Sequence, residues 1–292
     1  MTDIIIECGV SSLTDFQIDS KTHPLETIQR MKRIAKIGYS IDLEIIIYDG
    51  PQTPRAGGRD SEFSRIQLQD IIQELNGNGL PFMLSLNGGM NLPDNTDWYP
   101  DERTLLEQMA QTPDVGNKVT IADPRLLDKL KDEFPDLELI ASCIQQVFPH
   151  TAGYADKFPK YDYVVILNQD TTLAILEPHM AYADQMIVFL NLACHNPDLS
   201  KCCKHYKTKD KSFPDKTPVS KDGCYGTNAA LIGRYEELSE MVRKRITKFK
   251  VPRDSKLYQR QFYTLLTIAH DIKSGDNNSL RSVIPFYRAL TS

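Results

Sequence analysis

The chain has 292 residues, of which 41% are hydrophobic and 25% are charged, and this composition excludes a wholly disordered protein. No apolar run approaches the roughly 20 residues that a membrane-spanning helix needs, and the segment after Met1 lacks the basic and hydrophobic pattern of a secretion signal. We therefore expect no membrane insertion and a cytoplasmic location. The formal net charge of -5 gives no general attraction to nucleic acid.

Short apolar runs rich in β-branched residues recur along the chain and predict buried strands. Most are continuous rather than alternating, which is typical of parallel strands covered on both faces. There are eight of them, the number that a closed barrel requires, at residues 4–6, 43–48, 82–86, 119–122, 137–141, 163–167, 186–190 and 246–251.

Helical patterns fall between several of these runs, at residues 25–37, 64–75 and 125–134. Asp123-Pro124 supplies an expected N-cap and a favoured first residue for the third. Two amphipathic helices are expected at the end of the chain, over residues 255–272 and 279–290. This alternation predicts a single (β/α)8 barrel domain of the TIM type spanning residues 1–292, with a doubly wound open sheet as the alternative.

Polar residues follow the predicted strands, at the end where barrel enzymes build their active sites. Polar residues also end strands that have no catalytic role, so the collective placement matters more than any one of them. They are Glu7 and Cys8, Asp49, Asn87, Asp123, Ser142 with Gln145, Asn168, Asn191 with Cys194, and Lys250 with Arg253.

The loop over residues 49–60 interrupts the regular alternation. It places Gly57-Gly58 between Arg55 and Arg59, which suits either a mobile loop that closes over an anionic ligand or a solvated loop without such a role.

The second irregular segment, residues 194–226, contains seven lysines and four of the six cysteines of the chain. A loop of this length inside a compact domain needs something to order it, and a metal would supply that. We predict a cysteine-rich metal-binding insertion after the seventh strand, with Cys194, Cys202, Cys203 and Cys224 as ligands. Either Cys8 or Cys143 replaces one member of the adjacent pair if only one of the two binds.

Two metals suit this set of ligands. Four cysteines are enough for one [4Fe-4S] cluster. Zinc is the alternative, because His195 and His205 enlarge the set of ligands and structural zinc sites accept mixed sulfur and nitrogen donors.

Several stretches resemble the collagenase-like proteins of unassigned-peptidase family thirty-two, which includes anaerobic ubiquinone-hydroxylation proteins and transfer-RNA uridine hydroxylases. The strand-like segment 246–253, followed by Tyr258, is similar to the family's Phe-Lys-Ile-Glu-Gly-Arg strand, although Val251-Pro252 stands in place of its Glu-Gly. The other similar stretches, in the same order along the chain, are residues 82–87, 121–124, 139–145 and 163–167.

The resemblance implies an α/β barrel with an iron-sulfur cluster that carries out oxygen-independent hydroxylation of an aromatic ring or a nucleobase, the latter within RNA or DNA. An electron donor or a homologous partner subunit is expected. A peptidase and a non-catalytic metal-binding subunit are the alternatives. The substrate-binding residues expected in the hydroxylase are Arg55, Arg59, Asn87, Asp123, Asn168 and Arg253.

Overall fold

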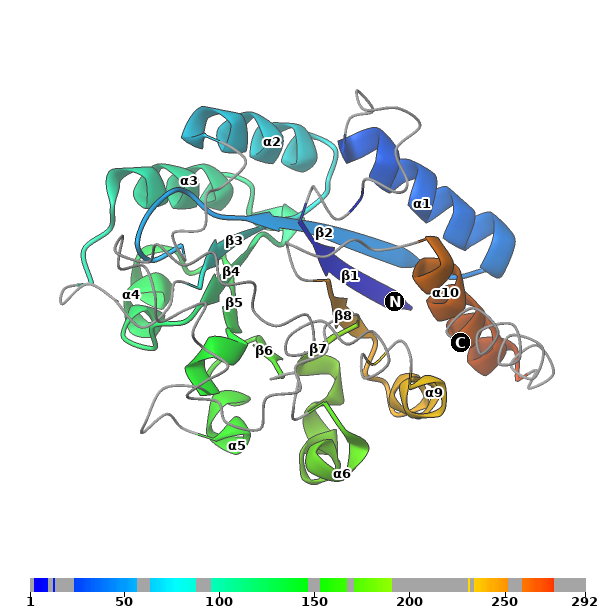
Figure 1. Cartoon of the computed structure of the whole chain (residues 1–292). Coiled ribbons are helices and arrows are strands. Elements are labelled where there is room, and N and C mark those ends of the chain that lie inside the picture. The colour runs from blue at the N-terminus through cyan, green and yellow to red at the C-terminus, as the bar shows by residue number, and fades with distance from the viewer. Residues whose placement is uncertain are drawn as a thin grey trace, which may run out of the picture. The chain divides into compact units, whose positions relative to one another are not determined.

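A computed structural model of the chain describes residues 3–9, 13, 24–56, 64–87, 96–146, 153–166, 171–190, 231, 234–251 and 259–275. Within them, eight strands follow one another in chain order around a closed barrel (Figure 1). The strands are β1 Ile4–Cys8, β2 Leu43–Asp49, β3 Phe82–Leu86, β4 Lys118–Ile121, β5 Glu138–Ala141, β6 Tyr163–Val165, β7 Met186–Phe189 and β8 Lys248–Lys250.

The pairings of β1 with β8, β2 with β3, β3 with β4, β4 with β5, β5 with β6 and β7 with β8 are all parallel. The predicted (β/α)8 barrel is therefore confirmed, and the open sheet is not the fold. The helices are α1 Pro24–Tyr39, α2 Arg65–Gly77, α3 Pro100–Ala110, α4 Leu126–Glu133, α5 Tyr154–Lys157, α6 Leu173–Leu176, α9 Tyr235–Arg243 and α10 Gln259–Ser274, with 3-10 helices η2 Pro113–Val115, η3 Cys143–Gln146 and η5 Glu177–Gln185.

The chain divides into two compact units. One comprises Met1–Ile45, Asn168–His195 and Lys221–Ser292, and the other comprises Ile46–Leu167 and Asn196–Ser220. The first unit carries β1, β7 and β8 with α1, α6, α9 and α10, and the second carries β3 to β6 with α2 to α5. The single domain over residues 1–292 stays a prediction.

Helix α2 shows how the sequence sets the ends and the buried face of an element. Ser64 is its N-cap and forms a capping box with Gln67, in which the Ser64 hydroxyl accepts from the Gln67 N–H and the Gln67 side chain accepts from the Ser64 N–H. Leu68, Ile72 and Leu75 recur at helical spacing and are buried. The predicted helix over residues 64–75 is thus confirmed.

Helix α4 begins later than the sequence suggests. Its first residue is Leu126 and its N-cap is Arg125, so the prediction that Asp123 is the N-cap is wrong. The chain makes a turn at residues 124–125 before the helix starts, and Asp123 Oδ1 accepts a hydrogen bond from the Arg125 N–H at 3.0 Å. Asp123 therefore stabilises the turn that precedes the helix.

The described residues 51–56 of the 49–60 loop form bends at 52–53 and a turn at 54–56, and Thr53, Arg55 and Ala56 are buried, so this part is not the solvated loop that the sequence allowed. Gly50 stands directly after β2, and a Cβ there would lie 2.5 Å from the backbone oxygen of Ser85, so only glycine fits this close approach. The predicted helix over 255–272 is confirmed from Gln259 on as α10, whereas residues 255–258, the predicted helix 279–290 and the insertion 194–226 lie outside the described residues. None of the helices in the described part of the chain combines the length and apolar character that a membrane crossing requires.

Candidate functional site

A buried ion pair joins the carboxyl ends of the first and last strands. Glu7 on β1 and Lys250 on β8 are opposite each other in the parallel register. Lys250 Nζ lies 3.0 Å from Glu7 Oε2, and the two residues are only 5% and 1% exposed. The backbone holds the strands at this level, because the Val251 N–H donates to Glu7 O at 2.7 Å and the Leu190 N–H donates to Lys250 O at 3.0 Å.

Burying this ion pair costs free energy of folding. Each charge loses its hydration on burial, and the mutual attraction of a buried pair often does no more than offset that loss, so apolar residues of similar volume would serve stability as well or better. In α/β barrels, residues at the carboxyl ends of the strands build the active site. The cost and the position together make Glu7 and Lys250 the candidate functional groups of this unit.

Cys8 follows Glu7 on β1 and is completely buried. Burial raises the pKa of its thiol to about 12, the nearby Lys250 ammonium lowers that pKa and Glu7 raises it. The role of Cys8 as an alternative metal ligand stays a prediction. Among the described residues, no group of three or more His, Cys, Asp and Glu side chains could hold a metal ion.

In the second unit, Asp123 and Gln145 are buried after β4 and β5. The Asp123 carboxylate accepts from the guanidinium of Arg125 at 2.8 to 3.1 Å. The Gln145 amide donates to Ile121 O at 2.9 Å and to the hydroxyl of Tyr161 at 3.1 Å. Burial raises the pKa of Tyr161, and the hydrogen bond from Gln145 lowers it. The predicted substrate residue Asp123 is therefore engaged by a neighbouring arginine.

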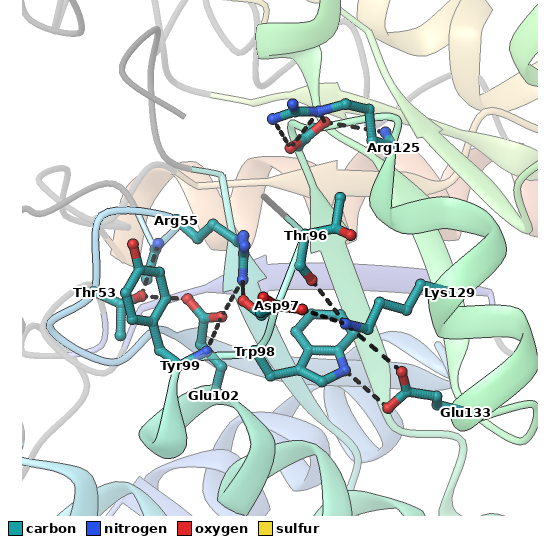
Figure 2. A network of polar contacts seen from close by, with 12 residues as sticks. Thr53, Arg55, Thr96, Asp97, Trp98, Tyr99, Glu102, Arg125, Lys129 and Glu133 are labelled. Atoms are coloured by element: carbon teal, nitrogen blue, oxygen red, sulfur yellow. Dashed lines mark hydrogen bonds and ion pairs between the residues drawn. The ribbon is translucent and has the colours of Figure 1, made fainter. Parts of the chain in front are cut away.

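Arg55 lies in a dense polar network instead of on an exposed loop (Figure 2). It is completely buried, and its Nη1 contacts Glu102 Oε2 at 2.9 Å and Asp97 O at 2.6 Å. Thr53 Oγ1 donates to the other Glu102 oxygen at 2.6 Å. Burial raises the pKa of Glu102, and its contacts with Thr53 and Arg55 lower it. The anion that Arg55 contacts is thus a carboxylate of the protein itself.

Aromatic rings complete this network. The Arg55 guanidinium carbon lies 5.8 Å from the ring centroid of Trp98 and 5.2 Å from that of Tyr99. The Trp98 Nε1–H donates to Glu133 Oε2 at 3.0 Å, and Lys129 Nζ lies 5.0 Å from the Trp98 centroid (Figure 2). The network fixes the segments that follow β2 and precede α3.

The remaining predicted substrate-binding residues and the four cysteines predicted as metal ligands are, apart from Asn87, outside the residues that the structure describes. Asn87 is partly exposed directly after β3. The following lie outside the described residues: Arg59, Asn168, Arg253, Cys194, Cys202, Cys203 and Cys224.

The sequence identifies Glu7 and Lys250 as polar residues at strand ends but does not pair them. The missing information is barrel closure, which makes the first and last strands neighbours across 243 residues of chain. An acidic residue directly after the first run and a basic residue late in the last run of an eight-run pattern are the signal that would have indicated the pair.

No family model matches the chain, and no curated protein matches it. Among solved structures, the chain is similar to 2,6-dihydroxybenzoate decarboxylase from Rhizobium, with 11% identity over 70% of this chain and 77% of that chain and a TM-score of 0.29. A structure of 2,6-dihydroxybenzoate decarboxylase complexed with 2,6-dihydroxybenzoate gives 11% identity, 64% and 72% coverage and a TM-score of 0.28. Likeness at this level carries no information about function, and the barrel assignment rests on the strand order itself.

Proposed function

We propose that the protein is an iron-sulfur α/β-barrel enzyme that carries out oxygen-independent hydroxylation, or a related modification, of an aromatic ring or a nucleobase. The observation that carries the proposal is the buried Glu7–Lys250 ion pair at the carboxyl ends of β1 and β8. An ion pair that costs stability at the catalytic end of a barrel is better explained by function than by packing.

The order of the strands supports a cofactor beside this pair. Strand β7 pairs with β8, and Phe189 at its end is the register partner of Lys250. In the sequence, Cys194 comes five residues after Phe189, so the cysteine-rich segment follows the strand that pairs with β8.

The proposed ligands are Cys194, Cys202, Cys203 and Cys224, a set of soft thiolate donors sufficient for one [4Fe-4S] cluster. When bound, such a cluster transfers single electrons to or from a substrate. The resemblance of the chain to the hydroxylases of family thirty-two supports iron over zinc, which the same residues with His195 and His205 would also bind.

The protein's own residues have distinct tasks in this proposal. The Lys250 ammonium donates a hydrogen bond to a ring carbonyl or hydroxyl oxygen of the substrate and stabilises negative charge that develops there. The Glu7 carboxylate orients Lys250 and accepts a proton from the substrate. Cys8 keeps its proton and packs beside them.

The proposal is tested in cells that lack the gene and are grown without oxygen. Complementation with the wild-type protein is expected to restore a nucleoside or a small aromatic compound that carries one additional oxygen atom, detected by mass spectrometry of digested RNA and of cell extracts. Glu7→Gln, which leaves the shape of the side chain intact, should abolish that product. Glu26→Gln, which alters an exposed carboxylate on α1, is the matched control. Full product formation by Glu7→Gln would contradict the proposal.

A further inference from the structure

Helix α1 carries a concentration of positive charge in an acidic chain. It contains four basic residues and one acidic residue, a net charge of +3, whereas the whole chain has a net charge of -5. Helices α3 and α9, by contrast, each contain three acidic residues and one basic residue. The positive charge of α1 is therefore a local feature that the net charge of the chain conceals, and a patch of this kind attracts anions.

Most of this charge lies on the side of α1 that faces solvent. Arg30, Arg33 and Lys36 recur at every third residue and are exposed, and we call these three residues the basic face of α1. The other side of the helix is buried and consists of Thr27, Ile28, Met31 and Ala35. The packing of the helix thus leaves the basic face uncovered by the described residues of the chain.

Nearby carboxylates compensate only part of the charge of the basic face. Lys36 Nζ contacts Asp42 Oδ1 at 2.6 Å, but the lysine side chain is still 63% exposed. Arg33 forms no ion pair with a described residue. Glu26, the single acidic residue of α1, lies in the first turn and so precedes the basic face. Positive charge therefore remains for a partner to neutralise.

The kind of partner follows from what else the helix presents. A helix that binds a membrane surface inserts an apolar face, and the apolar side of α1 is already buried in the protein. A protein interface is depleted of charged residues at its centre, whereas Ile37, which is 79% exposed, is the one large apolar side chain that α1 exposes strongly. A nucleic-acid backbone requires only spaced positive charges, and arginine binds phosphate with two parallel hydrogen bonds.

We propose that the basic face of α1 binds the phosphate backbone of nucleic acid. Contacts with phosphate carry no information about the base sequence, so binding should show no base preference and should weaken steeply with salt. This surface is independent of the iron-sulfur chemistry proposed above, because charge on the outer side of a helix requires neither a metal nor the Glu7–Lys250 ion pair.

The test measures binding of two fluorescein-labelled probes, an oligouridylate and a DNA duplex, to the full chain by fluorescence anisotropy at several salt concentrations. The double variant Arg30→Gln with Arg33→Gln should bind on the order of tenfold more weakly at low salt. For the oligouridylate, the slope of log K against log salt should become shallower by roughly 1.4, because each lost phosphate contact removes about 0.7.

The double variant Arg103→Gln with Lys131→Gln is the matched control. It removes two positive charges from exposed side chains on α3 and α4, so the net charge of the chain changes by the same amount. Its affinity and its salt slope should equal those of the wild type. Circular dichroism checks that both double variants fold, and Arg33→Glu, which reverses one exposed charge, provides a further variant.

Three outcomes would overturn the proposal. The first is a wild-type protein that binds neither probe at low salt. The second is an Arg30→Gln, Arg33→Gln variant that binds as tightly as the control variant. The third is displacement of the bound oligouridylate by polyglutamate or by vesicles containing phosphatidylserine at an equal concentration of negative charge, which would assign the basic face to an acidic protein or to a membrane surface.

Discussion

Removing both charges of the Glu7–Lys250 ion pair should have opposite consequences for stability and for activity: stability is largely kept and activity is lost. Lys250→Met leaves a carboxylate buried without its partner and should lower the free energy of unfolding by about 3–5 kcal/mol. The double variant Glu7→Leu with Lys250→Met removes both charges and should recover most of that loss, as measured by urea unfolding.

Both variants should nevertheless be inactive. If the pair acts on substrate, even the stable double variant fails in the complementation experiment, in which incorporation of an oxygen atom is the readout. A double variant that is both stable and fully active would assign the pair a structural role and remove the main support for the proposed site.

The lowered pKa of Lys157 predicts that the stability of the protein depends on pH. Its pKa is about 8 in the folded chain and 10.5 ordinarily, so the folded state releases its proton first as pH rises. The burial penalty is fully present below pH 8, declines between about pH 8 and 10.5, and is absent above. At pH 7, Lys157→Met should therefore be more stable than the wild type by about 1–3 kcal/mol.

Urea unfolding of both proteins between about pH 7 and pH 10 measures this difference, which should shrink as the pH increases. A difference that stays constant over this range would mean that Lys157 does not titrate there. A stabilising contribution from Lys157 at pH 7 would mean that the ammonium has a strong partner.

At the level of elements, Asn117 connects four of them at the amino ends of the strands. Its Oδ1 accepts from the Phe82 N–H at 2.8 Å and from the Asn76 amide at 2.9 Å, and its Nδ2 donates to Met109 O at 3.0 Å. Asn117→Ala leaves these buried groups unpaired and should cost about 2–4 kcal/mol of unfolding free energy.

Asn78→Ala is the matched control for this prediction. Asn78 is exposed at the end of α2 and donates a single side-chain hydrogen bond to Glu74 O. Its loss should cost less than about 1 kcal/mol by the same urea measurement. Equal costs for the two substitutions would show that the network around Asn117 is not a structural link between the elements.

The Arg55–Glu102 pair and an exposed pair on α3 provide a second comparison between elements. Arg55→Met leaves Glu102 buried without its charge partner and should destabilise the protein by about 3–5 kcal/mol. Arg103→Met breaks the exposed bridge to Glu107 and should cost no more than about 1 kcal/mol. Thermal and urea unfolding of both variants test this, and a small effect of Arg55→Met would contradict the buried network.

The elements themselves were largely predictable from the sequence. Continuous apolar runs predict buried parallel strands, and all eight are present. The network around Arg55 was not predictable, because the Gly57-Gly58 pair suits a mobile or a solvated loop and the partner, Glu102, lies 47 residues away. The burial of Asn117 was not predictable either, because a polar residue before a strand usually indicates a turn.

For the whole molecule, closure of the barrel is what converts strand-end residues into a site. The sequence pattern predicts eight strands, but closure is a property of the sheet and does not follow from the periodicity of any one run. Once the barrel closes, Glu7 and Lys250 become neighbours. The cysteine group could be predicted only as a set of ligands, because ligand chemistry specifies donors and leaves the metal and the geometry open.

The metal content of the chain purified without oxygen tests the account most directly. Iron, acid-labile sulfide and zinc are measured per chain, with electron paramagnetic resonance of the reduced protein. We predict roughly four iron and four sulfide per chain, lost in the paired replacement of Cys194 and Cys224 by serine and retained in Cys143→Ser. Stoichiometric zinc with iron near zero would contradict the iron-sulfur enzyme proposed here.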